Sequence, residues 1–306
     1  MFRPAKRSSA KLRLALCGPS GSGKTYSALQ IAKGLGGKIA LIDTERGSGE
    51  LYSDLCAYDV AQLTPPYTPA RHIEAIRAAE KAGYDIVIVD SLSHAWSGPG
   101  GVLEMQDQAA KALKNSFAAW REITPEHNRL VDTLLQTDLN VIVTMRTKTA
   151  YEVQQDGGKT KVVKIGLAPV QREGLEYEFT VVLDLSIDGH VATGTKDRTG
   201  LFDGQHFVAT EETGKMLGRW LRGSKADVLD ISPDGADLVL RSLTALGLAD
   251  LGGPYEDYVC RKYGLETIGE MKPEQLQEQL VILGQCRERP SRKKQFEEML
   301  RGKMSA

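Results

Sequence analysis

A glycine-rich segment near the N-terminus has the residue types and spacing that hold a phosphate chain. Residues 18–25 read GPSGSGKT, after an apolar run and before a helical pattern. Glycines let the backbone wrap around phosphates, the amides at a helix start point at them, and the lysine reaches the β- and γ-phosphates. The segment predicts a nucleotide-binding loop with these contacts: Gly18, Pro19, Ser20, Gly21, Ser22, Gly23, Lys24, Thr25 and Tyr26.

An aspartate on a later strand completes a predicted magnesium site. The run 84–92, YDIVIVDSL, predicts a buried strand in which Asp90 follows the apolar residues. A carboxylate in this position holds Mg²⁺ through water, and the hydroxyl that follows the loop lysine coordinates the same ion. We therefore expect ATP and Mg²⁺ as cofactors, with Thr25 and Asp90 as the metal-binding residues.

The group that activates water is predicted on another strand. Many motor ATPases place a glutamate directly after this aspartate, but here the position is Ser91. The run 38–45, KIALIDTE, predicts a strand with Asp43 and Glu45 at its carboxyl end, and parallel strands bring these ends to one crevice. We predict Glu45 as the catalytic base, assisted by Lys24, with Asp43 as structural support. The alternative is that the acids only cap the next turn.

The elements that must position these residues alternate along the first 220 residues. Apolar runs predict strands at 11–18, 38–45, 58–63, 84–92 and 139–147. Helical patterns lie at 23–35, 69–83 and 102–137, the last as a pair whose second helix starts at Thr124–Pro125. This alternation predicts a parallel sheet covered on both faces.

The pattern changes after residue 150. A D-G-G turn within 150–166 predicts an exposed hairpin, and strands return at 177–187 and 190–198. After residue 225 the sequence is helical and polar. The predicted organisation is a basic arm at 1–13, an α/β ATPase core at 14–222 and a small helical domain at 226–306.

Composition and charge limit the classes of function. The 306 residues carry a formal net charge of −1, and no apolar run approaches the roughly 20 residues of a membrane helix. The N-terminus lacks a secretory signal and the four cysteines are isolated, which predicts a cytoplasmic protein without a membrane partner. Three segments are nevertheless basic and could bind a polyanion locally: 1–13, 146–172 and 287–303.

At these motifs the chain resembles the RecA-like recombinase core. LIDTE (41–45) resembles the strand that carries the catalytic glutamate, and VIVDS (87–91) resembles the Walker B strand with its trailing serine. The match is closer still to phage-encoded RecA-like ATPases of the Sak-type single-strand annealing group. It covers about residues 10–210 and includes VDSLSHAW, TMRTKTAYEV, KIGLAPVQREGLEYEF and TKDRTGLFDG. The resemblance implies a RecA-like P-loop NTPase fold with a mostly parallel central sheet.

The resemblance also implies roles for single residues. Tyr52 would stack on the adenine, and Thr144 or Arg146 would sense the γ-phosphate. Lys196 and Arg198 would reach the ATP of a neighbouring protomer, unless they are ordinary surface charges. The hairpin and VQREG occupy the place of the DNA-binding loops, with phosphate contacts from these residues: Lys148, Lys159, Lys161, Lys164 and Arg172.

The same resemblance suggests partners. Phe2 and Ala5 form an F-x-x-A pair that would dock on the next protomer of a filament or ring, and the C-terminal helices resemble modules that bind single-stranded-DNA-binding protein. The expected function is an ATP-dependent recombination protein that binds single-stranded DNA and promotes annealing or strand exchange, with DNA-stimulated hydrolysis. The alternatives are a RecA-fold hexameric helicase or packaging motor and, less well supported, a small-molecule nucleotide kinase.

Overall fold

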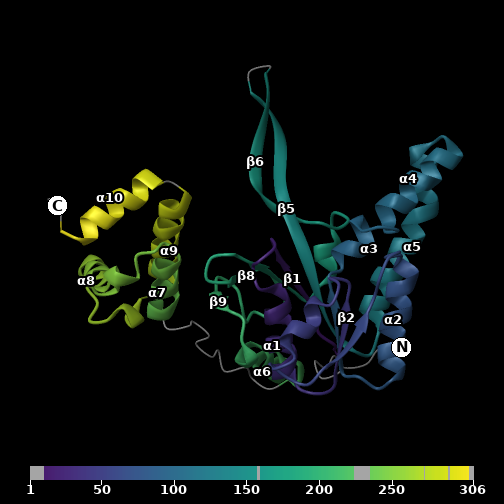
Figure 1. Cartoon of the computed structure of the whole chain (residues 1–306), viewed down its shortest axis with the longest axis horizontal. Coiled ribbons are helices and arrows are strands. Elements are labelled where there is room, and N and C mark those ends of the chain that lie inside the picture. Colours follow the sequence, from purple (N-terminus) through teal and green to yellow (C-terminus); the bar gives the residue numbers. More distant parts are fainter. Residues whose placement is uncertain (1–9, 157–158, 224–234, 272, 289, 303–306) are drawn as a thin grey trace.

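A computed structural model describes residues 10–156, 159–223, 235–271, 273–288 and 290–302, and between 149 and 167 it describes the backbone. The strands of its sheet are β1 Arg13–Gly18, β2 Ile39–Asp43, β3 Asp59–Gln62, β4 Ile86–Asp90, β5 Asn140–Asp156, β6 Lys159–Pro169, β7 Val181–Leu185, β8 Val191–Asp197 and β9 His206–Val208. Their order is β3-β2-β4-β5-β1-β7-β8-β9, and β6 pairs only with β5 (Figure 1). The strands from β3 to β7 in this order run parallel, which confirms the predicted fold class.

Helices cover both faces of the sheet. Those of the core are α1 Lys24–Leu35, α2 Pro69–Lys81, α3 Ser93–Ser97, α4 Val102–Leu113, α5 Ser116–Gln136 and α6 Glu211–Leu221. Successive residues of a strand point to opposite faces. Leu14 and Leu16 of β1 therefore pack with α1 and α6, whereas Ala15 and Cys17 pack with α2 and α5. The central strands are buried on both sides, so their carboxyl ends are held at fixed positions.

One predicted helix boundary is wrong. The second helix of the pair starts at Ser116, and Pro125 lies inside it. The side chain of Asn115 caps this start by accepting a hydrogen bond from Ala118 N at 3.0 Å. A proline inside a helix costs one backbone hydrogen bond. Here the buried face continues past the proline with Leu130 and Leu134, whose packing against the sheet offsets that loss.

Arg13, which we counted with the basic arm, begins β1 and is buried. Its guanidinium donates to four backbone carbonyl oxygens between 2.6 and 2.9 Å away, those of Leu12, Leu135, Thr137 and Leu139. Burial lowers the pKa of Arg13 to about 10. The side chain thus ties β1 to the end of α5 and is not available to a polyanion.

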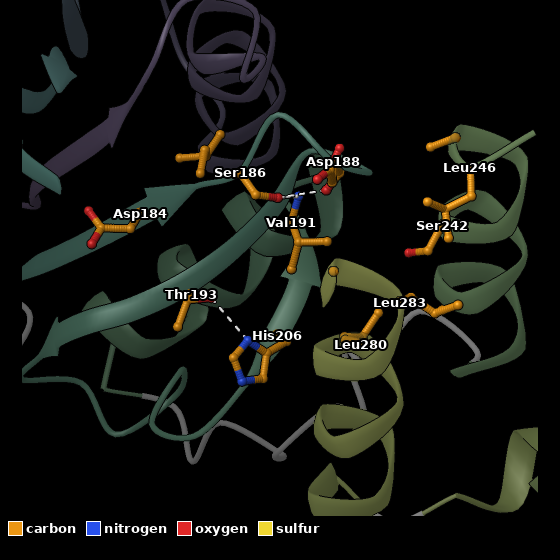
Figure 2. Close-up of a pocket in the computed structure, with 13 residues that line it drawn as sticks. Asp184, Ser186, Asp188, Val191, Thr193, His206, Ser242, Leu246, Leu280 and Leu283 are labelled. Atoms are coloured by element: carbon orange, nitrogen blue, oxygen red, sulfur yellow. Dashed lines mark hydrogen bonds between the residues drawn. The ribbon is translucent and has the colours of Figure 1, made fainter. Parts of the chain in front are cut away.

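The C-terminal helices are α7 Gly235–Ala245, α8 Gly252–Tyr263, α9 Pro273–Glu288 and α10 Pro290–Leu300. They share a core of their own in which Tyr255 is fully buried and donates its hydroxyl to Gln279 at 2.8 Å. Leu246, directly after α7, and Leu283 of α9 face β8 and the edge strand β9 across a hollow of about 380 Å³ (Figure 2). This hollow contains no residue of the glycine-rich loop.

Candidate active site

The glycine-rich loop connects β1 to α1, as the sequence predicts. Gly21 and Gly23 have φ values of 81° and 82°, which strain any residue with a Cβ. A Cβ on Gly18 would lie 2.7 Å from the carbonyl oxygen of Leu185, so the loop also needs glycine where β1 ends. Lys24 donates to the carbonyl oxygen of Pro19 at 2.7 Å, and burial lowers the pKa of its amine. The loop and its lysine are therefore shaped to surround a phosphate chain.

The two predicted metal ligands meet beside the loop. Thr25 Oγ1 donates to Asp90 Oδ2 at 2.6 Å, and Thr144 Oγ1 donates to Asp90 Oδ1 at 2.5 Å. Asp90 is 2% exposed, and its burial raises the pKa of the carboxyl group while the two hydroxyls oppose this shift. A hydroxyl and a carboxylate in contact at the loop fit Mg²⁺, which keeps waters and nucleotide oxygens as its other ligands. Among the described residues, no cluster of three or more His, Cys, Asp or Glu side chains forms a separate metal site.

The structure brings Glu45 to the same edge of the sheet. β2 and β4 pair in parallel with Asp43 opposite Asp90, and Glu45 follows two residues later. Burial raises the pKa of Asp90, and the negative charge of Glu45 adds to this shift. Burial lowers the pKa values of Lys24 and His94, and the charge of Glu45 opposes both shifts. Glu45 is half-buried at the mouth of the site, where a carboxylate can accept a proton from a water molecule.

Asp43 holds the turn that carries Glu45. Its carboxylate is fully buried and accepts three backbone N–H groups, from Glu45 at 2.5 Å, Gly47 at 2.8 Å and Gly49 at 3.3 Å. Gly47 has φ 89°, so the turn uses a glycine in the left-handed region. The predicted structural role of Asp43 agrees with these contacts.

The two candidates for the γ-phosphate sensor differ in their surroundings. Thr144 is fully buried and its hydroxyl is used by Asp90. Arg146 is exposed, its Nε donates to Glu45 Oε1 at 2.9 Å, and its second nitrogen pairs with Glu45 Oε2. The positive charge of Arg146 also contributes to lowering the pKa of Lys24. Arg146 is therefore the candidate that a phosphate could reach.

Tyr52, the predicted adenine-stacking residue, ends a short 3-10 helix at Ser48–Tyr52 and is half-buried. Its ring meets that of Tyr26 edge-on, with centroids 6.1 Å apart. Tyr26 follows the loop directly and is 40% exposed. The two rings form an aromatic ledge beside the start of α1, where a planar base could pack.

Lys196 and Arg198 lie far from this edge of the sheet. Lys196 pairs with Val182 near the amino end of β7, whereas the glycine-rich loop follows the carboxyl end of β1. Both cations donate to the carbonyl oxygen of Tyr177, Arg198 at 3.2 Å. They do not contribute to the phosphate site of their own protomer.

The predicted DNA-binding residues lie on and around one hairpin, formed by β5 and β6, that projects from the sheet (Figure 1). Lys148 is exposed at its base, and Lys159, Lys161 and Lys164 are on β6. Arg172 lies after β6, half-buried near His127, so it faces a different part of the surface. Phe2 and Ala5 lie outside the described residues.

Two histidines that we did not predict also lie at the site. His94 Nδ1 is 2.7 Å from Thr44 Oγ1, and its ring stacks on Tyr67. His190 is in the turn between β7 and β8, and a Cβ on Gly23 would lie 3.2 Å from its Nδ1. Neither residue has a spacing that marks it in the sequence, because both reach the loop through the topology of the sheet.

A family model described as an AAA domain matches residues 10–219, which is more than half of the chain. The search of curated proteins returned no match. In the part of the chain that the structure describes, no helix is both long enough and apolar enough to cross a membrane.

Proposed function

The chain belongs to the AAA domain family, which assigns it a nucleotide-hydrolysing activity, and we propose that it couples this activity to single-stranded DNA. The observation that carries the proposal is the course of β5. This strand bears Thr144 and Arg146 at the nucleotide site and continues into the hairpin that bears the basic residues. A single strand common to both sites gives DNA a direct mechanical connection to the hydrolytic centre.

In the proposed reaction each residue at the sheet edge has a separate task. The loop amides and Lys24 hold the phosphate chain. Glu45 accepts the proton of the attacking water, and Thr144 keeps the Asp90 carboxylate in one orientation. Mg²⁺, held by Thr25 and Asp90, would neutralise charge on the β- and γ-phosphates. Arg146 responds to the γ-phosphate, since the Thr144 hydroxyl is already used.

Assembly is the second part of the proposal. Lys196 and Arg198 can act only on the nucleotide of a neighbouring protomer, because they lie at the opposite end of the sheet from their own loop. A cation delivered in this way stabilises the charge of the transferring phosphate. We further propose self-association into a filament or ring, with Phe2 and Ala5 as one contact, and docking of single-stranded-DNA-binding protein on the C-terminal helices.

The finer assignment is a recombination protein of the phage annealing type. It is supported by the resemblance of the nucleotide motifs to the Sak-type group and by the basic hairpin. A helicase or packaging motor would use the same ATPase core, but it would separate a duplex. A strand-displacement assay therefore distinguishes the two, and ATP-dependent unwinding without annealing would favour the motor.

The central experiment measures ADP release by the full chain with and without oligothymidylate, together with filter retention of the DNA at low salt. We expect retention that weakens as salt rises, because phosphate contacts release counterions. We also expect faster turnover in the presence of DNA. Equal turnover with no retention would refute the proposed function.

A further inference from the structure

A polar cleft opens beside Glu45, and Lys24 is not among the residues that line it. Its volume is about 350 Å³, and it lies beyond the carboxyl ends of β2 and β4, next to Arg146 within β5. The charged and aromatic groups that line it are Glu45, Arg46, Tyr67, His94 and Arg146. We call this hollow the Glu45 cleft. It borders the proposed hydrolytic base directly. The proposed reaction uses Glu45 and Arg146 from its lining but gives Arg46 and His94 no role.

The wall formed by His94 is rigid. The Nδ1 atom of His94 is held by Thr44 Oγ1 at 2.7 Å, and its ring stacks on Tyr67 at a centroid distance of 4.9 Å. Tyr67 is 4% exposed, and its hydroxyl donates to the carbonyl oxygen of Thr44 at 3.1 Å. These contacts fix the imidazole in one orientation, so the cleft is preorganised for a ligand on this side.

The cleft carries an excess of positive charge. Among the described residues that line the cleft, Glu45 carries the only carboxylate. Arg146 neutralises this carboxylate through two hydrogen bonds. Arg46 is exposed, and among the described residues it has no hydrogen-bond or ion-pair partner. Burial lowers the pKa of the His94 imidazole, and the positive charges of Arg146 and Arg46 add to this shift, whereas the negative charges of Glu45 and Asp43 oppose it. Within the described part of the chain, the guanidinium of Arg46 has no partner, and that of Arg146 is held by Glu45 alone. A cleft with these two groups is suited to bind an anion.

An anion in this cleft would compete with Glu45 for Arg146. A phosphate group accepts two parallel hydrogen bonds from a guanidinium, as a carboxylate does. The pair it would disturb is partly exposed, with side-chain exposures of 48% and 24%, and ion pairs of this kind contribute little stability. Arg146 can therefore exchange partners readily, and the exchange leaves the Glu45 carboxylate free to accept a proton from water.

We propose that the Glu45 cleft binds a phosphate group of single-stranded DNA through Arg46, His94 and Arg146, and that this binding releases Glu45 for hydrolysis. The proposal rests on the proposed function and adds the site at which DNA controls it. β5 supports DNA as the source, because exposed Lys148 follows Arg146 by two residues on the way into the hairpin. Free orthophosphate has the same chemistry, and the experiment separates the two.

The test uses the full chain at saturating ATP and measures the ratio of turnover with saturating oligothymidylate to turnover without it. Arg46→Gln should lower this ratio by about ten-fold or more, the effect of one hydrogen bond to a charged group. Lys148→Gln is the matched control, because it removes the same charge outside the cleft. It should raise the DNA concentration needed for half-maximal stimulation and leave the maximal ratio unchanged. An unchanged maximal ratio in Arg46→Gln would overturn the proposal.

Arg146→Gln tests the release step. Without the Arg146–Glu45 ion pair, Glu45 is already free before DNA binds. The ratio of turnover with DNA to turnover without it should therefore fall to about one, whatever the absolute turnover of the variant. A variant that is still stimulated like the parent protein would show that release of Glu45 is not the mechanism. Circular dichroism spectra equal to those of the parent protein would confirm that the variants are folded.

The remaining measurements distinguish a failure of the cleft proposal from a failure of the proposed function. If the parent protein retains DNA but is not stimulated by it, DNA binding stands and the cleft proposal fails. If the parent protein neither retains DNA nor is stimulated by it, the proposed function fails. Orthophosphate added in place of DNA then tests separately whether the Glu45 cleft binds a phosphate group. Stimulation by orthophosphate that Arg46→Gln abolishes would identify free phosphate as the ligand. No response to orthophosphate would overturn the site.

Discussion

Replacement of Asp43 by asparagine tests whether the proposed base, Glu45, is held in place by the turn that carries it. The Asp43 carboxylate is fully buried and accepts the N–H groups of Glu45, Gly47 and Gly49. An asparagine of the same shape has one oxygen, so its NH₂ group must face at least one of these donors. The rotamer that keeps two hydrogen bonds leaves the oxygen toward Gly47 and Gly49 and turns the NH₂ group against the Glu45 amide.

The loss can be estimated from these contacts. A hydrogen bond to a charged group contributes about 1.5–3 kcal/mol, and the partly buried amide of Glu45 would be left without a partner. We expect the free energy of unfolding of Asp43→Asn to fall by about 2 kcal/mol. The backbone of Glu45 would shift with its amide, and a displacement of about 1 Å at a reacting group can cost about 100-fold in turnover. Nucleotide affinity should change little, because the loop lies on other strands.

Thermal unfolding, steady-state ADP release and titration with a fluorescent ATP analogue measure the three quantities. Asp107→Asn is the control, because Asp107 is exposed on α4 and the change in charge is the same. An Asp43→Asn variant with the unfolding midpoint of the parent protein would refute the role of the three hydrogen bonds. A lowered midpoint with normal turnover would refute the link between this turn and the catalytic position of Glu45.

Three other changes have defined outcomes. Glu45→Gln should bind ATP normally and lose about 100- to 10,000-fold in turnover, measured as ADP release; normal turnover would remove the base assignment. Lys196→Ala/Arg198→Ala should be inactive alone and should regain activity when mixed with Glu45→Gln, since each protomer type supplies what the other lacks; no recovery would argue against catalysis in trans. Burial lowers the pKa of His72 to about 4 from 6.5, so the unfolded chain takes up a proton first as pH falls. Stability in urea should drop from pH 6.5 toward pH 4, by about 3 kcal/mol at most, and His72→Gln should flatten that dependence.

The sequence was sufficient for features that depend on neighbours in the chain. The residues that predict the glycine-rich loop, and those that predict the apolar strand before Asp90, each lie within about ten positions of one another. The structure has both features where the pattern predicts them. The start of α5 was mispredicted for the opposite reason. Pro125 is a strong local signal for a boundary, but the burial of Leu130 and Leu134 against the sheet decides the length of the helix. Tertiary packing overrides a local preference of this size.

The contacts that define the candidate site depend on topology instead. Arg146 and Glu45 are 101 residues apart in sequence, and neither position has a pattern that indicates the other. They meet because β5 and β2 both flank β4, so that Arg146, within β5, lies at the edge of the sheet where β2 and β4 end. The same order places β1 between β5 and β7, which is why His190 reaches Gly23 although no motif contains it.

This geometry also changes what a sensor residue has to do. The resemblance implies a side chain that contacts the γ-phosphate, yet Thr144 is turned toward Asp90 and Arg146 is engaged by Glu45. If Glu45 is the base, as we propose, then Arg146, which already neutralises it, can respond to a phosphate group by leaving the Glu45 carboxylate. Binding and activation then become one event, because the same guanidinium cannot hold Glu45 and a phosphate group with its full set of hydrogen bonds at once. The rate of hydrolysis would follow the fraction of molecules in which Arg146 has left Glu45, and that fraction is set by the difference in affinity of Arg146 for its two partners.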